Sequence, residues 1–116
     1  MADPDPCAPL VDQATRLVDR LRTMSLDRLD APWEGSTRRS AAIVVSQRLA
    51  DTAARWEGPE PGRRQVPDVV AAAVGDLVAI CAYDVVAAAS RRPVDAEVRA
   101  VLEALAQDCL DLRRRL

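Results

Sequence analysis

The sequence predicts an all-α protein, an antiparallel up-down-up-down four-helix bundle whose third long helix is apolar on nearly every side. Apolar residues recur at three- and four-residue steps in four long segments, and no segment shows the alternation of a β-strand. The connections between the segments are short, which favours antiparallel neighbours. At 116 residues the chain fits one domain, and we expect residues 1–116 to share a single core.

The composition is that of a folded helical protein. Hydrophobic residues make up 49% of the chain, but Phe is absent, so the core must be built from alanine and small branched side chains. All sixteen basic residues are arginine, a usage that points to the GC-rich codons of a high-GC bacterium. These arginines are interspersed with eighteen carboxylates, and the net charge of −2 argues against nucleic-acid binding.

The first helix is expected over residues 6–23, because Pro6 and Pro9 are tolerated only in a first helical turn. One face of this helix carries its apolar residues. They are Leu10, Val11, Ala14, Leu17, Val18, Leu21 and Met24. Residues 25–29 are expected to add a short helical turn. A loop over residues 30–35 follows, since Pro32 disfavours helix at the residue before it.

The second helix is expected over residues 37–56, with Ser36 as its N-cap. An irregular loop over residues 57–66 ends it, because this stretch contains two Pro and two Gly. The last helix is expected over residues 94–115, opened by Pro93. Its apolar residues form a heptad-like seam. They are Val94, Val98, Leu102, Leu105, Cys109, Leu112 and Leu116.

The third long helix is expected over residues 67–90, with Pro67 in its first turn and Asp68 near its positive end. At 100° per residue this helix divides into three faces. The bulky face, suited to the core, carries Val70, Val74, Leu77, Val78, Cys81 and Val85. The smooth face, suited to close helix packing, carries Ala71, Gly75, Ala79, Ala82 and Ala89. The remaining face is the one with polar atoms and carries Asp76, Ile80, Tyr83, Asp84 and Ala87.

Two arrangements would suit this third face. In the first, the protein is a monomer and Asp76 and Asp84 look at water. In the second, it is a homodimer, and either this face or the smooth residues Gly75 and Ala79 meet a second subunit. Aspartates buried in such a contact would need cationic partners, for which the candidates on neighbouring helices are Arg16, Arg20 and Arg48.

The sequence offers little for catalysis. It has no histidine, which excludes imidazole bases and histidine-ligated metals, and its four glycines form no phosphate-binding loop. Cys7, Cys81 and Cys109 are far apart, and the last two lie in apolar helical patterns. We therefore expect reduced structural thiols in a cytoplasmic protein, and we assign no catalytic residue, metal ligand or cofactor.

The sequence also contains a candidate anion site and one segment long enough to cross a membrane. Arg38 and Arg39 would share one end of an up-down bundle with Arg91 and Arg92, which suggests an anion site, although many carboxylates compensate that end. Residues 66–89 are long enough to span a membrane, but two aspartates near the middle favour a soluble core helix. The acidic N-terminus does not resemble an export signal.

These observations favour a cytoplasmic, non-enzymatic protein that acts by association, with itself as a homodimer or with another protein. The second interpretation is a regulatory domain that binds a small molecule near Tyr83 and Asp76, or an anion at the four arginines. An enzymatic function is the third and least favoured interpretation. Neither nucleic acid nor membrane is an expected partner.

Overall fold

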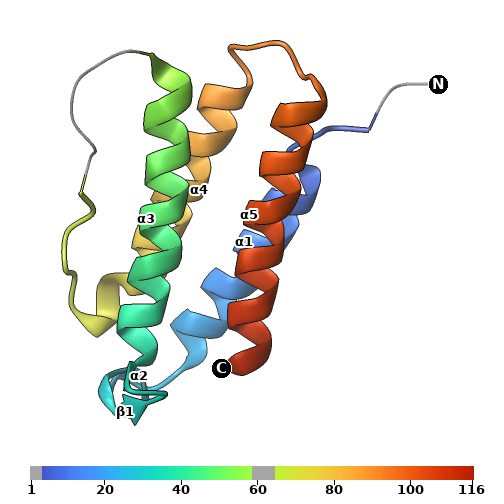
Figure 1. Ribbon diagram of the computed structural model, residues 1–116. Coiled ribbons are helices and arrows are strands. Elements are labelled where there is room, and N and C mark those ends of the chain that lie inside the picture. Colours follow the sequence, from blue (N-terminus) through green and yellow to red (C-terminus); the bar gives the residue numbers. More distant parts are fainter. Residues whose placement is uncertain (1–3, 59–64) are drawn as a thin grey trace.

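Four long helices lie side by side in the computed structural model, which describes residues 4–58 and 65–116 (Figure 1). Its elements are α1 (Ala8–Thr23), α2 (Leu26–Asp30), β1 (Pro32–Trp33), β2 (Ser36–Thr37), α3 (Arg38–Glu57), the 3₁₀ helix η1 (Ala71–Ala73), α4 (Val74–Ala89) and α5 (Ala96–Arg115). The all-α class is confirmed. Within the described ranges the strands are limited to the two-residue pair β1 and β2, which the sequence analysis did not foresee.

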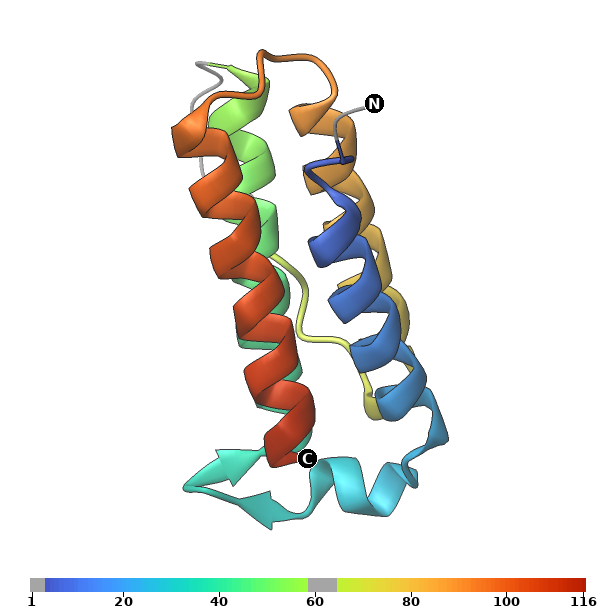
Figure 2. The ribbon, with the colours of Figure 1, turned by 90° about the vertical axis from the view of Figure 1, so that its right-hand side faces the viewer.

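The four long helices do not alternate in direction, so the up-down-up-down order is wrong. Helices α3 and α4 both run away from the end where α2 lies, while α1 and α5 run towards it (Figures 1 and 2). Two contacts agree with this order. Arg39, at the start of α3, bonds to Asp68 and to the carbonyl of Val69 just before α4. Arg20, near the end of α1, donates to the carbonyl of Leu116 beyond α5.

The parallel arrangement arises because the chain stays extended before α4. The amide of Val66 donates to the side-chain oxygen of Gln47 at 2.9 Å, and the Arg39 guanidinium donates to Asp68 at 2.7 Å and to the carbonyl of Val69 at 3.2 Å. These α3 side chains satisfy polar groups that a helical turn would otherwise pair. Helix α4 therefore begins at Val74, not at Pro67. Most of the predicted loop at 57–66 lies outside the described residues.

Local capping moves two other helix starts. Thr37, rather than Ser36, caps α3, because its hydroxyl accepts a hydrogen bond from the amide of Ser40 at 3.0 Å. Asp95 caps α5 in the same way at the amide of Val98, so Pro93 lies ahead of the helix. The expected loop after α2 is a hairpin instead. Its turn residues, Glu34 and Gly35, have φ of 47° and 77°, as a two-residue hairpin turn requires.

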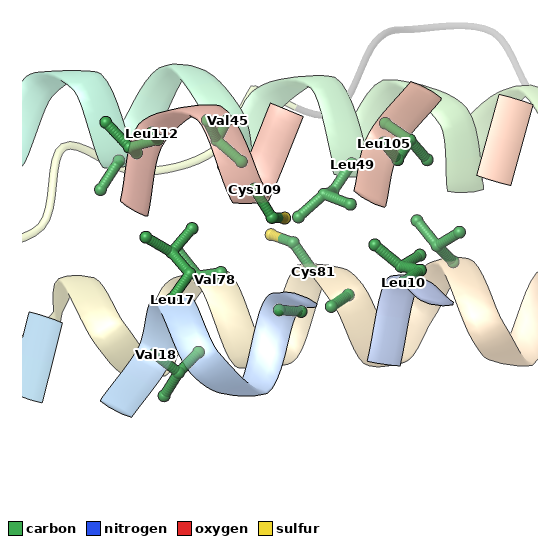
Figure 3. Packing of buried hydrophobic residues seen from close by; sticks show 14 of the residues in the cluster. Leu10, Leu17, Val18, Val45, Leu49, Val78, Cys81, Leu105, Cys109 and Leu112 are labelled. Carbon is green, nitrogen blue, oxygen red and sulfur yellow. The ribbon is translucent and has the colours of Figure 1, made fainter. Parts of the chain in front are cut away.

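The core lies between the four long helices (Figure 3) and is built from aliphatic side chains and three thiols. Helix α4 contributes most of its predicted bulky face to it, whereas Val70 precedes the helix and is 70% exposed. Gly75 packs against α1. A Cβ added there would lie 3.1 Å from Cγ of Arg22 and 3.6 Å from the carbonyl oxygen of Val18, so the glycine allows the close approach of α1 and α4.

Leu49 on α3 tests the burial assigned to this core. It is fully buried, and Leu49→Ala should lower the free energy of unfolding by about 2–5 kcal/mol in urea denaturation because it leaves a cavity. Val44 lies on the same helix and is 51% exposed, so Val44→Ala should change it by less than about 0.5 kcal/mol. Equal effects of the two substitutions would contradict the packing described.

Candidate functional site

A groove of about 310 Å³ runs along the outside of the molecule between α1 and α4. The groove exists because α4 presents small alanine side chains there, while most of its larger side chains point into the core. The lining is mostly apolar, with polar groups chiefly towards the end of α1. The lining residues are Val11, Ala14, Thr15, Val18, Asp19, Arg22, Ala79, Ala82, Tyr83 and Val86.

Large apolar side chains project beside this groove. Ile80 is 59% exposed and Tyr83 is 72% exposed, and Val11 on α1 is 47% exposed although its position in the sequence pattern predicted a core residue. Tyr83 both lines the groove and projects from it. One side of the molecule therefore presents a hollow and apolar projections next to each other.

Asp76 pairs with Arg22 across α1 and α4. The Nη2 of Arg22 lies 2.5 Å from Oδ1 of Asp76, and both side chains are more than half exposed, so the pair adds little to stability. Arg22 is not among the three arginines expected to pair with a buried aspartate, and each of those three makes another contact. Arg16 pairs with Asp12, Arg20 donates to Leu116, and Arg48 lies 3.4 Å from Asp108.

The predicted interface residues divide into three groups. Asp76, Ile80 and Tyr83 are exposed on the outward side of α4, whereas Asp84, Ala87 and Ala79 are half-buried. Ala79 lines the α1–α4 groove. Gly75 is buried against α1 and was wrongly included, because no second subunit can reach it in this packing.

Sequence reasoning missed the contribution of α1 to this surface. Thr15, Asp19 and Arg22 line the groove from α1, but the amphipathic pattern gave no sign of which helix flanks α4. That choice depends on the direction of α4. The glycine at position 75 was the one available signal, since it indicated that another backbone comes close.

The four arginines of the predicted anion site do not come together. Arg38 and Arg39 begin α3, whereas Arg91 and Arg92 follow α4, and the parallel course of the two helices puts these pairs at opposite ends of the molecule (Figure 1). Arg39 is bound to two carboxylates, Asp30 at 2.6 Å and Asp68 at 2.7 Å. The hydrogen bond to Asp30 raises the pKa of Arg39 above its ordinary value. The anion site is therefore wrong as a single site.

Arginine side chains lie over the rings of both tryptophans. Trp33 has the guanidinium carbons of Arg38 and Arg115 over its ring, 5.3 Å and 4.9 Å from the centroid. Trp56 has that of Arg92 over its ring at 5.4 Å. Both rings are half-buried and pack against the core, and cations over their faces complete these contacts.

A second groove, of about 340 Å³, lies between α3 and α5. Charged side chains take a larger part in its lining, including Arg48, Asp108 and Arg115. Val44 borders it as an exposed aliphatic side chain. Helices α3 and α5 lie across the molecule from α1 and α4 (Figure 2), and the groove between them has a more polar lining, so it is a suitable comparison for the α1–α4 groove.

The three cysteines are free thiols buried in the core. Cys81 on α4 and Cys109 on α5 point towards one another (Figure 3). Burial, with a smaller contribution from Asp84, raises the pKa of Cys81 to about 11. Burial and the neighbouring Asp108 raise the pKa of Cys109 to about 12. Both groups are thus neutral thiols at physiological pH and poor nucleophiles.

No group of three or more metal-ligating side chains gathers within residues 4–58 and 65–116. The segment Ala71–Ala89 is long and apolar enough to cross a membrane, with a mean hydropathy of 1.8, but half of it is buried inside the protein, as in a core helix of a soluble protein. Comparison of the chain with protein-family models, with curated proteins and with solved structures gave no match.

The raised thiol pKa values predict how stability depends on pH. A thiol whose pKa is higher in the folded state favours folding while it is protonated, and this contribution is lost as pH rises from about 9 to about 11 and above. We expect the free energy of unfolding to fall by at least about 1 kcal/mol between pH 9 and pH 11. The double variant Cys81→Ala, Cys109→Ala should show a shallower decline in the same urea titrations. Identical slopes would contradict the burial of these thiols.

Proposed function

We propose that this protein acts by self-association as a homodimer, through the α1–α4 surface. This surface comprises the groove between the two helices and the outward side chains of α4 beside it, Asp76, Ile80 and Tyr83. The observation that carries the proposal is the combination of an apolar groove with exposed Ile80 and Tyr83 on one side of the molecule.

A twofold contact uses the same patch on both subunits, so the patch must be complementary to itself. The α1–α4 surface can meet this condition, because Ile80 and Tyr83 project from each copy and can pack against each other across a twofold axis. Ile80 is 59% exposed, so burying the rest of its side chain would contribute about 1–2 kcal/mol per subunit. Tyr83 adds a large ring whose hydroxyl can stay at the wet edge of the contact.

The environment of the surface supports association over catalysis. The thiols nearest to it are neutral, and the polar side chains of the groove include a paired arginine and an acid rather than a nucleophile beside a base. A non-enzymatic role in the cytoplasm follows as part of the proposal, since reduced cysteines suit that compartment. Another protein with an apolar helix could take the place of the second copy on the same surface.

The second candidate function is the binding of a small apolar molecule in the α1–α4 groove. Its volume of about 310 Å³ is at the lower end of the range of ligand sites, and a few polar groups accompany the apolar lining. Titration with 8-anilinonaphthalene-1-sulfonate tests it. Wild type should bind the dye and raise its fluorescence. Ala79→Leu should abolish this rise because it fills the α1–α4 groove, whereas Ala41→Leu, in the α3–α5 groove, should leave the rise unchanged. A rise unaffected by Ala79→Leu would count against this site.

Light scattering on three proteins tests self-association. Wild type should give twice the chain mass at micromolar concentration, and Ile80→Arg should give the monomer mass because it places a charge in the contact. Val44→Arg is the matched control, since Val44 is exposed to a similar degree but borders the α3–α5 groove, and it should leave the dimer intact. A monomer mass for wild type would refute the proposal, and loss of the dimer in Val44→Arg alone would move the interface to the other groove.

A further inference from the structure

We infer that two copies pair through antiparallel α4 helices, with Ile80 of each copy opposite Tyr83 of the partner subunit. The inference rests on the proposed self-association and specifies the orientation and register of the contact. It follows from the spacing of the outward residues on α4 and from the charges at the two ends of that helix.

The outward residues of α4 form one stripe along the helix. They are exposed Asp76, Ile80 and Tyr83 and half-buried Ala87, which follow one another at steps of four, three and four. This spacing keeps a stripe in contact with a second helix that crosses at a small angle. The stripe has large side chains at its centre and a small one near its end, so it can pack against another helix along its length.

The stripe is symmetric about the point midway between Ile80 and Tyr83. A twofold axis at this point places Ile80 against Tyr83 of the partner subunit in two equivalent contacts. It also places Asp76 opposite Ala87 of the partner subunit, where a small side chain leaves room for the carboxylate. The two aromatic rings then lie on either side of the axis rather than against each other.

Charge selects the antiparallel pairing over the parallel one. Parallel helices in register would bring the two copies of Asp76 together, and like charges at a contact oppose binding. In the antiparallel register the two Asp76 side chains are separated by about 16 Å along the axis, at 1.5 Å per residue.

Arg91 supplies a complementary charge in this register. It follows Ala87 by about one turn, just after α4, and is exposed. The twofold axis places it about one helical turn, or roughly 6 Å along the axis, from Asp76 of the partner subunit, a distance that the long arginine side chain can span. Arg22 is bonded to Oδ1 of Asp76, which leaves Oδ2 for a second donor, because a carboxylate accepts several hydrogen bonds. The contact thus has an apolar centre and an ion pair at each end.

Disulfide cross-linking tests the register. Asp76→Cys and Ala87→Cys are made separately, and one carries a mass tag. After air oxidation, a mixture of the two variants should form the mixed cross-linked dimer. Each variant alone should cross-link at least fivefold less, because its two introduced thiols lie far apart along the axis. The native thiols are buried and do not compete.

Other results of this experiment overturn the register without ambiguity. Cross-linking of each variant with itself would show parallel helices. No cross-link in any sample, with a dimer mass in light scattering, would refute the register but not self-association. A monomer mass for wild type would refute both.

A charge reversal tests the pairing of Arg91 independently. Arg91→Glu should raise the dissociation constant of the dimer about fivefold at low salt in sedimentation, since it replaces the cation near Asp76 of the partner subunit with a second acid. Arg99→Glu is the matched control, because Arg99 is an exposed residue of α5, and it should leave the dissociation constant unchanged. Equal dissociation constants for both variants would overturn the placement of Arg91 beside Asp76.

Discussion

The contact of Arg39 with the segment before α4 determines the arrangement of the rest of the structure. Its guanidinium, on a side chain that is 25% exposed, holds Asp30, Asp68 and the carbonyl of Val69 at the start of α3. Helix α4 must therefore begin at the end where α3 begins, and the two helices run parallel. This single choice of direction decides that α1 lies antiparallel beside α4, which residues line their groove, and which side of α4 is left outside.

An almost wholly apolar helix needs cover on more sides than one neighbour can supply. Helix α4 buries most of its bulky face in the core and approaches α1 closely at Gly75, where the glycine removes the side chain that would collide with Arg22 and the backbone of Val18. No helix within residues 4–58 and 65–116 covers the outward side. Ile80 and Tyr83 remain in water there at a cost in solvation, and the proposed contact with a second copy would relieve it.

The structural features that local sequence patterns encode could be predicted, whereas contacts between distant parts of the chain could not. The all-α class and the inward position of Val78 and Val85 follow from periodicity, which each helix carries in its own residues. The direction of α4 depends on Arg39 meeting residues 29 and 30 positions further along the chain, a contact that no local pattern encodes. The predicted anion site failed for the same reason, since it assumed alternating helices. The outward face was identified correctly at Ile80 and Tyr83 but could not be connected to α1.

Tyr83 is the one tyrosine of the chain, so its ring reports on the outward side of α4 without interference. The most direct measurement is the effect of a soluble paramagnetic agent on its ring protons in nuclear magnetic resonance, over a dilution series of the protein. Self-association through this side predicts weak relaxation of Tyr83 at high concentration and strong relaxation on dilution, while half-buried Trp33 and Trp56 stay constant. Strong relaxation of Tyr83 at every concentration would contradict it.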